Sequence, residues 1–189
     1  KPADTDQPFR QKLVDLVLDE LRGPDGRIHV EDAISAAATI VGERCIDAAG
    51  DYPLRDHTMP PGQHAFSTRA NELICGDSSE GVSKIPSDSI VGVLRARLDS
   101  RKYSDAEFPE MSAVFRQFAS RAGKLDDWGK ASLSVPREHF PIILPLQIGY
   151  QTRTRVDNIL APIRHDKARC LRIATESLAD ILTQVTSVI

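Results

Sequence analysis

The longest uncharged stretch of the chain marks its central element. Residues 33–42 carry no charge, and they suit the interior of a helix whose apolar stripe continues into the polar segment that follows. Glu31 and Asp32 suit its first turn, where carboxylates interact favourably with the helix dipole, and Gly50 suits a left-handed C-terminal cap. The pattern predicts a buried central helix over residues 31–49. Its stripe consists of Ile34, Ala37, Ala38, Val41, Cys45 and Ala48.

Helical periodicity predicts four further amphipathic helices. Pro8 suits the first position of one of them and Gly23 ends it, while Ser87 or Asp88 can cap another. Residues 1–7 are predicted to form a loose terminal arm. The last of the four is a long C-terminal helix that packs on the core or on a second subunit. The four helices cover residues 8–21, 88–99, 109–123 and 166–189.

Two short segments predict a small β-sheet. Residues 27–30 form an extended entry to the central helix, and residues 66–75 form a run after which Gly76 and Asp77 turn the chain. The alternative for the second segment is a short helix that begins near Ala70. With these segments as strands, residues 1–189 are predicted to form a single, mainly helical α+β domain.

Residues 144–156 fit two templates. Apolar side chains alternate strictly with polar or small ones along them, which is the pattern of a strand. A strand of thirteen residues is more than twice the usual length, however, and Pro145 suits the first turn of a helix. Val156 and Ile159 also continue a helical stripe. We favour the helix and keep the strand as the alternative.

Composition and charge limit the class of protein. With 189 residues, of which 41% are hydrophobic and 27% charged, the chain is long enough for one good core. A net charge of −3 and a single tryptophan argue against a general nucleic-acid binder, which needs a basic surface and stacking aromatics. No membrane span is predicted, because the uncharged part of the central helix has ten residues and a span needs ~20.

The cysteines and the first residues bear on location. Cys45, Cys75 and Cys170 are widely separated and odd in number, so they predict thiols in a reducing compartment rather than a disulfide framework. The chain begins KPADTDQPF, which is polar and lacks the apolar core of a signal peptide. We therefore expect a cytoplasmic protein.

A proline-rich segment after the central helix offers a candidate metal site. Imidazole and carboxylate groups such as it carries suit zinc, manganese or iron. Its two histidines are seven residues apart with no regular element between them, and neither an HExxH motif nor paired cysteines support the site. The alternative is a set of exposed loop residues. The candidate ligands are Asp51, Asp56, His57 and His64.

A second candidate site is a histidine held by carboxylates. In an extended segment His29 and Glu31 point to one side, and Asp77 ends the predicted strand that could lie beside them. A histidine oriented by a carboxylate can act as a general base or as a pH-sensitive switch. His139 completes this candidate catalytic set. The alternative is a helix entry that is satisfied by polar neighbours.

Positive charge gathers towards the end of the chain. Between residues 153 and 172 six cationic side chains stand against only Asp157 and Asp166. This strip could bind a small anionic ligand or an acidic partner. It could equally pair with acidic residues near the N-terminus, such as Glu20, within one chain or between subunits. The candidate anion-binding residues are Arg153, Arg155, Arg169 and Arg172.

Three short pieces of the chain resemble a family of bacterial proteins of unknown function. They are residues 26–31 (GRIHVE), which lead into a helix of small residues, residues 76–77 (GD) after the predicted strand, and residues 136–139 (PREH). The resemblance implies a shared architecture and a bacterial source, and it implies no activity.

Two functional hypotheses fit these observations. The first is a non-enzymatic protein, a homo-oligomer, that acts through its interface or through a bound small anion. The second is a metal-assisted hydrolase that uses the loop histidines or the His29 set. No GxSxG elbow, Walker A loop or GxGxxG fingerprint occurs in the chain, and the sequence identifies no cofactor.

Overall fold

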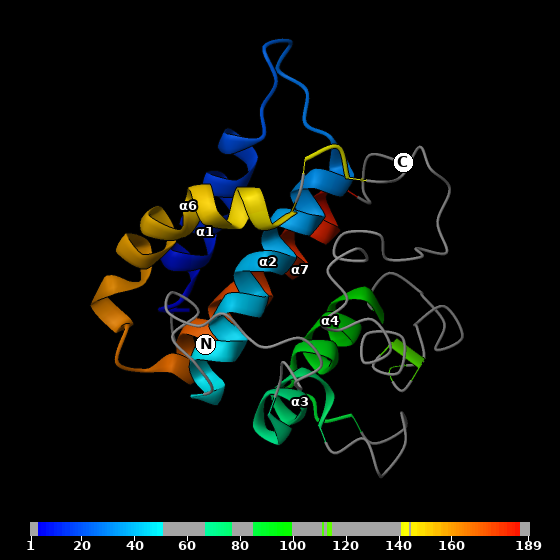
Figure 1. Cartoon of the computed structure of the whole chain (residues 1–189), viewed down its shortest axis with the longest axis vertical. Coiled ribbons are helices and arrows are strands. Elements are labelled where there is room, and N and C mark those ends of the chain that lie inside the picture. Colours follow the sequence, from blue (N-terminus) through cyan, green and yellow to red (C-terminus); the bar gives the residue numbers. More distant parts are fainter. Residues whose placement is uncertain are drawn as a thin grey trace, which may run out of the picture. The chain divides into compact units, whose positions relative to one another are not determined.

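The computed structural model describes residues 4–50, 67–76, 85–99, 111, 113–114, 141–143 and 145–185. The chain divides into two compact units, Lys1–Arg44 with Val135–Ile189 and Cys45–Ser134. The elements, shown in Figure 1, are α1 (Gln7–Glu20), α2 (Val30–Ala49), α3 (Thr68–Cys75), α4 (Ile90–Asp99), α6 (Pro145–Leu160), the 3-10 helix η6 (Ala161–Ile163) and α7 (Lys167–Val185).

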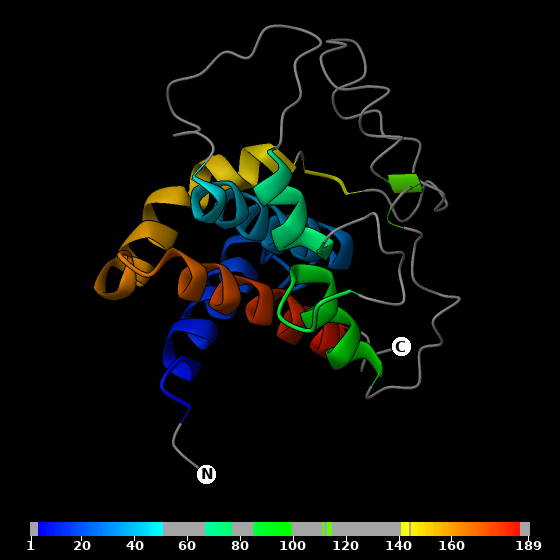
Figure 2. The same ribbon diagram turned by 90° about the horizontal axis from the view of Figure 1, so that it is seen from below.

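In the first unit, α2 and α6 pack side by side in parallel. The carboxylate of Asp32 accepts a hydrogen bond from the backbone N–H of Ile142, and Arg153 donates to the carboxylate of Glu43. Each of these contacts joins residues 110 positions apart. A constant offset means that the two helices run in the same direction. Figure 2 shows the yellow α6 lying beside α2.

The same unit contains a second parallel pair, α1 and α7. Arg172 donates to the carboxylate of Asp6, and Arg10 donates to the carboxylate of Glu176. Both contacts have an offset of 166 residues. Each pair therefore joins a helix from the start of the chain to one from its end.

One side of the central helix is buried, and it includes three of the six predicted stripe residues, Ala37, Val41 and Cys45. Ile34 and Ala48 are half-buried, and Ala38 is exposed. Ala36 has no exposed surface, and Ile40 and Val41 are 4% and 3% exposed. The helix begins at Val30 and ends at Ala49, and Gly50 has the positive φ of a left-handed cap, so the prediction of a buried helix at this position is confirmed. Further core side chains of this unit come from α1, α6 and α7, among them Leu13, Val14, Val17, Ile148, Val156, Leu160, Ile173 and Ile181.

The predicted mixed α+β fold is wrong, because every regular element among the described residues is a helix. The segment predicted as a strand over residues 66–75 contains α3, whose N-terminus is capped by the side chain of Ser67 accepting from the N–H of Ala70. Residues 27–29 are irregular and lead directly into α2. The serine cap explains the error, since it satisfies a helix N-terminus locally and a strand there would need a distant partner.

Of the ambiguous segment over residues 144–156, residues 145–156 are helical, as favoured, and belong to α6. Its buried side chains are those of Ile148, Thr152, Val156 and Leu160, each four positions from the next. A spacing of four is a multiple of the strand period of two and is also close to one helical turn. This coincidence explains why the same residues fitted both templates.

The ends of the helices differ in detail from those predicted from the sequence. The cap of α4 is Ser89, whose hydroxyl accepts from the N–H of Gly92 at 3.1 Å, rather than Ser87 or Asp88. The C-terminal helix begins after Asp166, whose side chain accepts from the N–H of Arg169 at 2.9 Å. Most of the helix predicted over residues 109–123 lies outside the described residues. Among the helices that the structure describes, none has the length and apolar character needed to cross a membrane.

Candidate functional site

The predicted catalytic histidine lies just before α2, beside two carboxylates. Nδ1 of His29 is 3.4 Å from Oδ2 of Asp32 and 3.6 Å from Oε2 of Glu31, is shielded from solvent and makes no hydrogen bond. The structure thus brings two of the predicted residues together. The other two, Asp77 and His139, lie outside the described residues.

Asp32 also belongs to this cluster, although the sequence did not identify it as a partner of His29. Its carboxylate is almost fully buried, and Oδ1 accepts the backbone N–H groups of Ile142 at 2.7 Å and Ile143 at 3.0 Å. These bonds tie the start of α2 to the chain that enters α6. The carboxylate therefore holds two segments together and presents its second oxygen to His29.

The predicted metal site falls outside the described residues. All four of its candidate ligands, Asp51, Asp56, His57 and His64, lie in residues 51–66, between α2 and α3 in the sequence. In the part of the chain that the structure describes, no group of three histidine, cysteine, aspartate or glutamate side chains is placed to hold a metal ion.

The four arginines predicted to bind an anion are each paired with a carboxylate of the first unit. Pairing with the acidic N-terminal region was the alternative to ligand binding, and Glu20 is one of the partners. An incoming anion would have to displace a carboxylate that is already bound. The pairs are Arg153–Glu43, Arg155–Glu20, Arg169–Asp6 and Arg172–Asp6.

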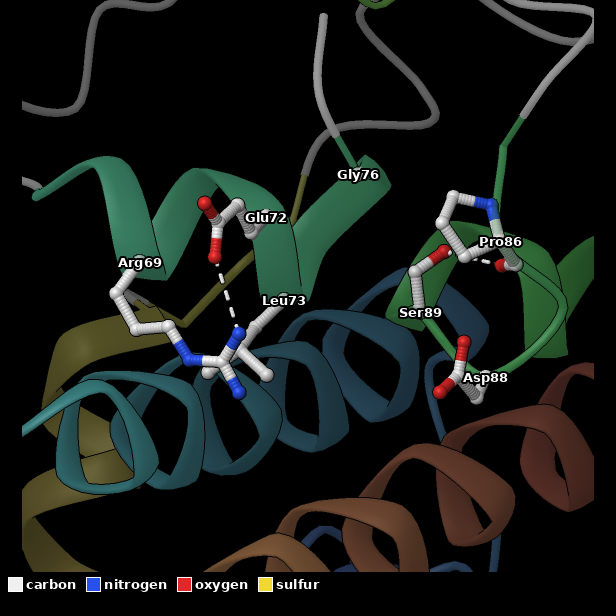
Figure 3. Close-up of a pocket in the computed structure, with 7 residues that line it drawn as sticks. All are labelled: Arg69, Glu72, Leu73, Gly76, Pro86, Asp88 and Ser89. Atoms are coloured by element: carbon white, nitrogen blue, oxygen red, sulfur yellow. Dashed lines mark hydrogen bonds and ion pairs between the residues drawn. The ribbon is translucent and has the colours of Figure 1, made fainter.

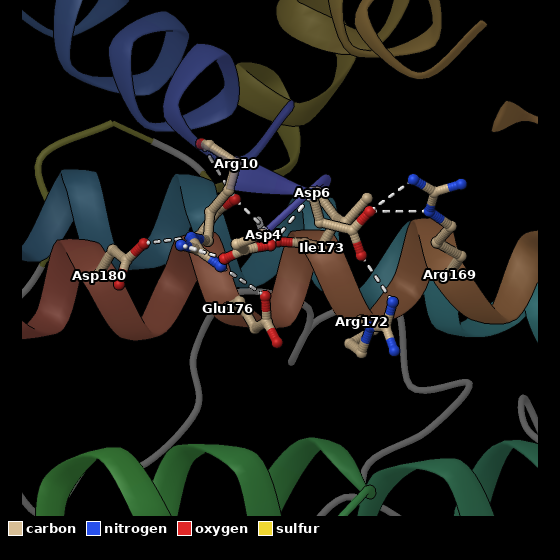
Figure 4. Close-up of polar contacts among 9 residues, drawn as sticks. Asp4, Asp6, Arg10, Arg169, Arg172, Ile173, Glu176 and Asp180 are labelled. Carbon is tan, nitrogen blue, oxygen red and sulfur yellow. Dashed lines mark hydrogen bonds and ion pairs between the residues drawn. The ribbon is translucent and has the colours of Figure 1, made fainter. Parts of the chain in front are cut away.

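Asp6 is the centre of one of these clusters (Figure 4). Its buried carboxylate accepts from Nε of Arg169 at 2.8 Å and from Nη2 of Arg172 at 2.6 Å. Burial opposes ionisation of the carboxyl, but the hydrogen bonds from the two guanidinium groups outweigh it and hold the pKa of Asp6 below its usual value. Residues 1–7 were predicted to form a loose arm, but Asp6 is anchored to α7 and Asp4 pairs with Arg10 of α1.

Arg10 forms the second cluster between α1 and α7. Its largely buried guanidinium lies 2.8 Å from Glu176, 2.9 Å from Asp180 and 3.0 Å from Asp4. Burial opposes the charge, but the carboxylates prevail and raise the pKa of Arg10. Figure 4 shows the side chain lying among these three acidic groups. With its donors engaged in this way, Arg10 is a structural residue.

Acidification is expected to weaken the contact between α1 and α7. Because the pKa of Asp6 is lowered in the folded state, its stabilising effect is present above the unfolded-state pKa and is lost as the pH falls through the folded-state pKa. Asp6→Asn should lower the free energy of unfolding by about 1–2 kcal/mol at neutral pH, since both arginines are partly exposed. The difference should disappear well below about pH 3.9, the ordinary aspartate pKa. Urea unfolding of both proteins across this pH range measures it, and a difference that does not change with pH contradicts it.

The second unit contains a pocket of about 350 Å³ between α3 and the start of α4 (Figure 3). Much of its polar lining is already paired. Arg69 donates to Glu72 at 3.0 Å, and the hydroxyl of Ser89 donates to the carbonyl of Pro86 at 2.7 Å. Because these groups bind one another, the pocket presents little chemistry to a ligand. The full lining is Arg69, Glu72, Leu73, Gly76, Pro86, Asp88 and Ser89.

The exposed side of α6 is the clearest surface feature of the first unit. The side opposite the buried residues of the helix carries six exposed side chains, and all six are uncharged. Tyr150 is 76% exposed and Ile142, just before the helix, is 75% exposed. We call the six residues the α6 outer face. They are Gln147, Tyr150, Gln151, Thr154, Asn158 and, in η6, Ala161.

The three charged residues of α6 flank the α6 outer face, and each has a partner within the unit. On one side Arg153 binds Glu43, and its guanidinium lies 5.8 Å from the centroid of the Tyr150 ring, within the range of a cation–π contact. Hydrogen bonding to Glu43 raises the pKa of Arg153. The pairs Arg44–Asp157 and Arg155–Glu20 complete the two flanks. The charges that α6 itself carries are therefore neutralised within the unit.

Comparison with known proteins identifies neither a family nor a related structure. No protein-family model, no curated protein and no solved structure matches the chain.

Proposed function

We propose that this protein works by binding another protein chain through the α6 outer face, and that it is not an enzyme. The observation that carries the proposal is the α6 outer face, where Tyr150 is 76% exposed among side chains that are all uncharged. Ile142, just before the helix, is a second large apolar side chain exposed on this unit. Tyrosine is enriched in protein interfaces, whose centres are depleted of charged residues. A tyrosine ring also buries a large area and has few rotatable bonds to order.

Two further features support the proposal. The arginines that could have bound a small anion are engaged by carboxylates. Binding through an interface is therefore better supported than binding of a small anion. Cys45, Cys75 and Cys170 are buried thiols, and burial raises the pKa of Cys75, which makes its thiol a poor nucleophile. Unpaired thiols also fit a reducing compartment, and we place the protein in the cytoplasm.

Photo-crosslinking in cells tests the proposal. Replacement of Tyr150 by p-benzoylphenylalanine keeps an aromatic ring and places a crosslinker on the α6 outer face. Irradiation should yield covalent adducts between this chain and a protein partner. The matched control carries the same group in place of Lys12, which is exposed on α1. If position 150 gives no more protein adducts than position 12, the proposal is wrong.

A further inference from the structure

We infer that the partner of the α6 outer face is a second copy of this chain, with the two α6 helices packed antiparallel. This inference rests on the proposed function and names the partner. It follows from the chemistry of the residues that form the α6 outer face, from the direction of the helix and from the charges beside it.

The polar side chains of the α6 outer face are complementary to themselves. Glutamine and asparagine side chains each carry both donors and acceptors, and a threonine hydroxyl can do either. A surface built from such groups can satisfy its own copy across a two-fold axis, as an isologous dimer requires. The charged side chains of α6 that flank this surface, Arg153, Arg155 and Asp157, are paired within the unit, so they do not favour a strongly acidic or basic partner.

The length of the α6 outer face and the volumes of its side chains favour the antiparallel arrangement. The stripe from Gln147 to Ala161 is roughly 21 Å long at about 1.5 Å per residue. Antiparallel packing centred on Thr154 sets Tyr150 against the far end of the second copy's stripe, where Asn158 and Ala161 have short side chains. Parallel packing would bring the two Tyr150 rings to the same level and align the two helix dipoles unfavourably.

The dimer is expected to be weak. A single helix pair buries less than the ~1,600 Å² of a standard stable interface, so association should depend on concentration. Tyr150 is the largest side chain of the surface, and Tyr150→Ala should raise the dissociation constant at least about tenfold. Sedimentation of the full chain from micromolar to near-millimolar concentration measures this change, with Lys12→Ala as the control. Because Tyr150 is exposed, its truncation leaves the core intact.

Cysteine crosslinking tests the orientation. The three native cysteines are buried, so a disulfide formed under a mild oxidant reports on an introduced cysteine. Thr154→Cys should form a covalent dimer, because the two-fold axis brings its two copies together. A mixture of Gln147→Cys and Ala161→Cys should give the mixed dimer in excess over either homodimer. The control is Lys12→Cys, which should crosslink no faster than random collision.

The outcomes separate the two proposals. Homodimers of Gln147→Cys in excess over the mixed dimer would overturn the antiparallel arrangement. A chain that stays monomeric at every concentration would overturn the second copy as partner. If the adducts formed at position 150 nevertheless contain a different protein, the proposed function stands without this inference. If no adducts form there, both fall.

Discussion

Asp32→Ala is expected to lower the free energy of unfolding by about 3 kcal/mol. The substitution leaves the backbone N–H groups of Ile142 and Ile143 without the carboxylate that both of them bind, and each unsatisfied donor costs about 1–3 kcal/mol. The same change also releases the chain that leads into α6 from the start of α2. Chemical unfolding followed by far-UV circular dichroism measures the loss.

Two variants control this measurement. Asp32→Asn keeps an oxygen that can accept both bonds and removes the charge, so it should cost less than Asp32→Ala, about 1 kcal/mol. Asp15→Ala removes an exposed carboxylate from α1 and should change stability by no more than about 0.5 kcal/mol. If Asp32→Ala is as stable as Asp15→Ala, the carboxylate does not hold the two segments together.

Gly149→Ala is expected to destabilise the protein by about 2 kcal/mol even though alanine is the better helix former by about 0.5–1 kcal/mol. A Cβ at position 149 would lie 2.4 Å from Cγ2 of Thr39, which no real contact permits. Thr39 cannot easily turn away, because it is branched at Cβ and its hydroxyl donates to the carbonyl of Ser35 at 2.9 Å. The new methyl group must therefore push α6 away from α2.

A double-mutant cycle isolates this contact. Thr39→Ser deletes the obstructing methyl group and keeps the hydroxyl bond to Ser35. In the Thr39→Ser background, Gly149→Ala should no longer destabilise, and helix propensity should make it stabilising by up to about 1 kcal/mol. The coupling energy between the two sites should then be about 2–3 kcal/mol. Additive effects would show that the close approach of α2 and α6 is not what limits the size of the side chain at position 149.

The helical part of the fold could be predicted because its signal is local. The apolar stripe of residues 31–49 and the flanking signals, such as Pro8 and Gly50, follow the chain at helical spacing, and α1, α2 and α7 begin within a few residues of where they were expected. The prediction of a small sheet, in contrast, was wrong. A short run such as residues 66–75 contains both β-branched and helix-forming residues, and a single serine cap decided the outcome.

The polar contacts of the first unit were largely hidden from the sequence. Asp6 and Asp32 look like ordinary acidic residues at helix starts, and nothing nearby shows that their partners lie 163 and 110 residues away. The basic strip was visible, but the sequence could not tell ligand binding from pairing within the chain. Tyr150 was recognised only as one apolar position in an alternating run. Its exposure emerged when the helix placed it opposite Ile148 and Val156.

The parallel pairing of early and late helices affects how the chain is made. Because α2 meets residues 110 positions later and α1 meets residues 166 positions later, neither has its partner until most of the protein has left the ribosome. At ~5–20 residues per second, α2 waits roughly 5–20 s with its apolar face uncovered. A fold closed by such distant contacts has a high contact order for a helical protein, so it should fold slowly and depend on chaperones during synthesis.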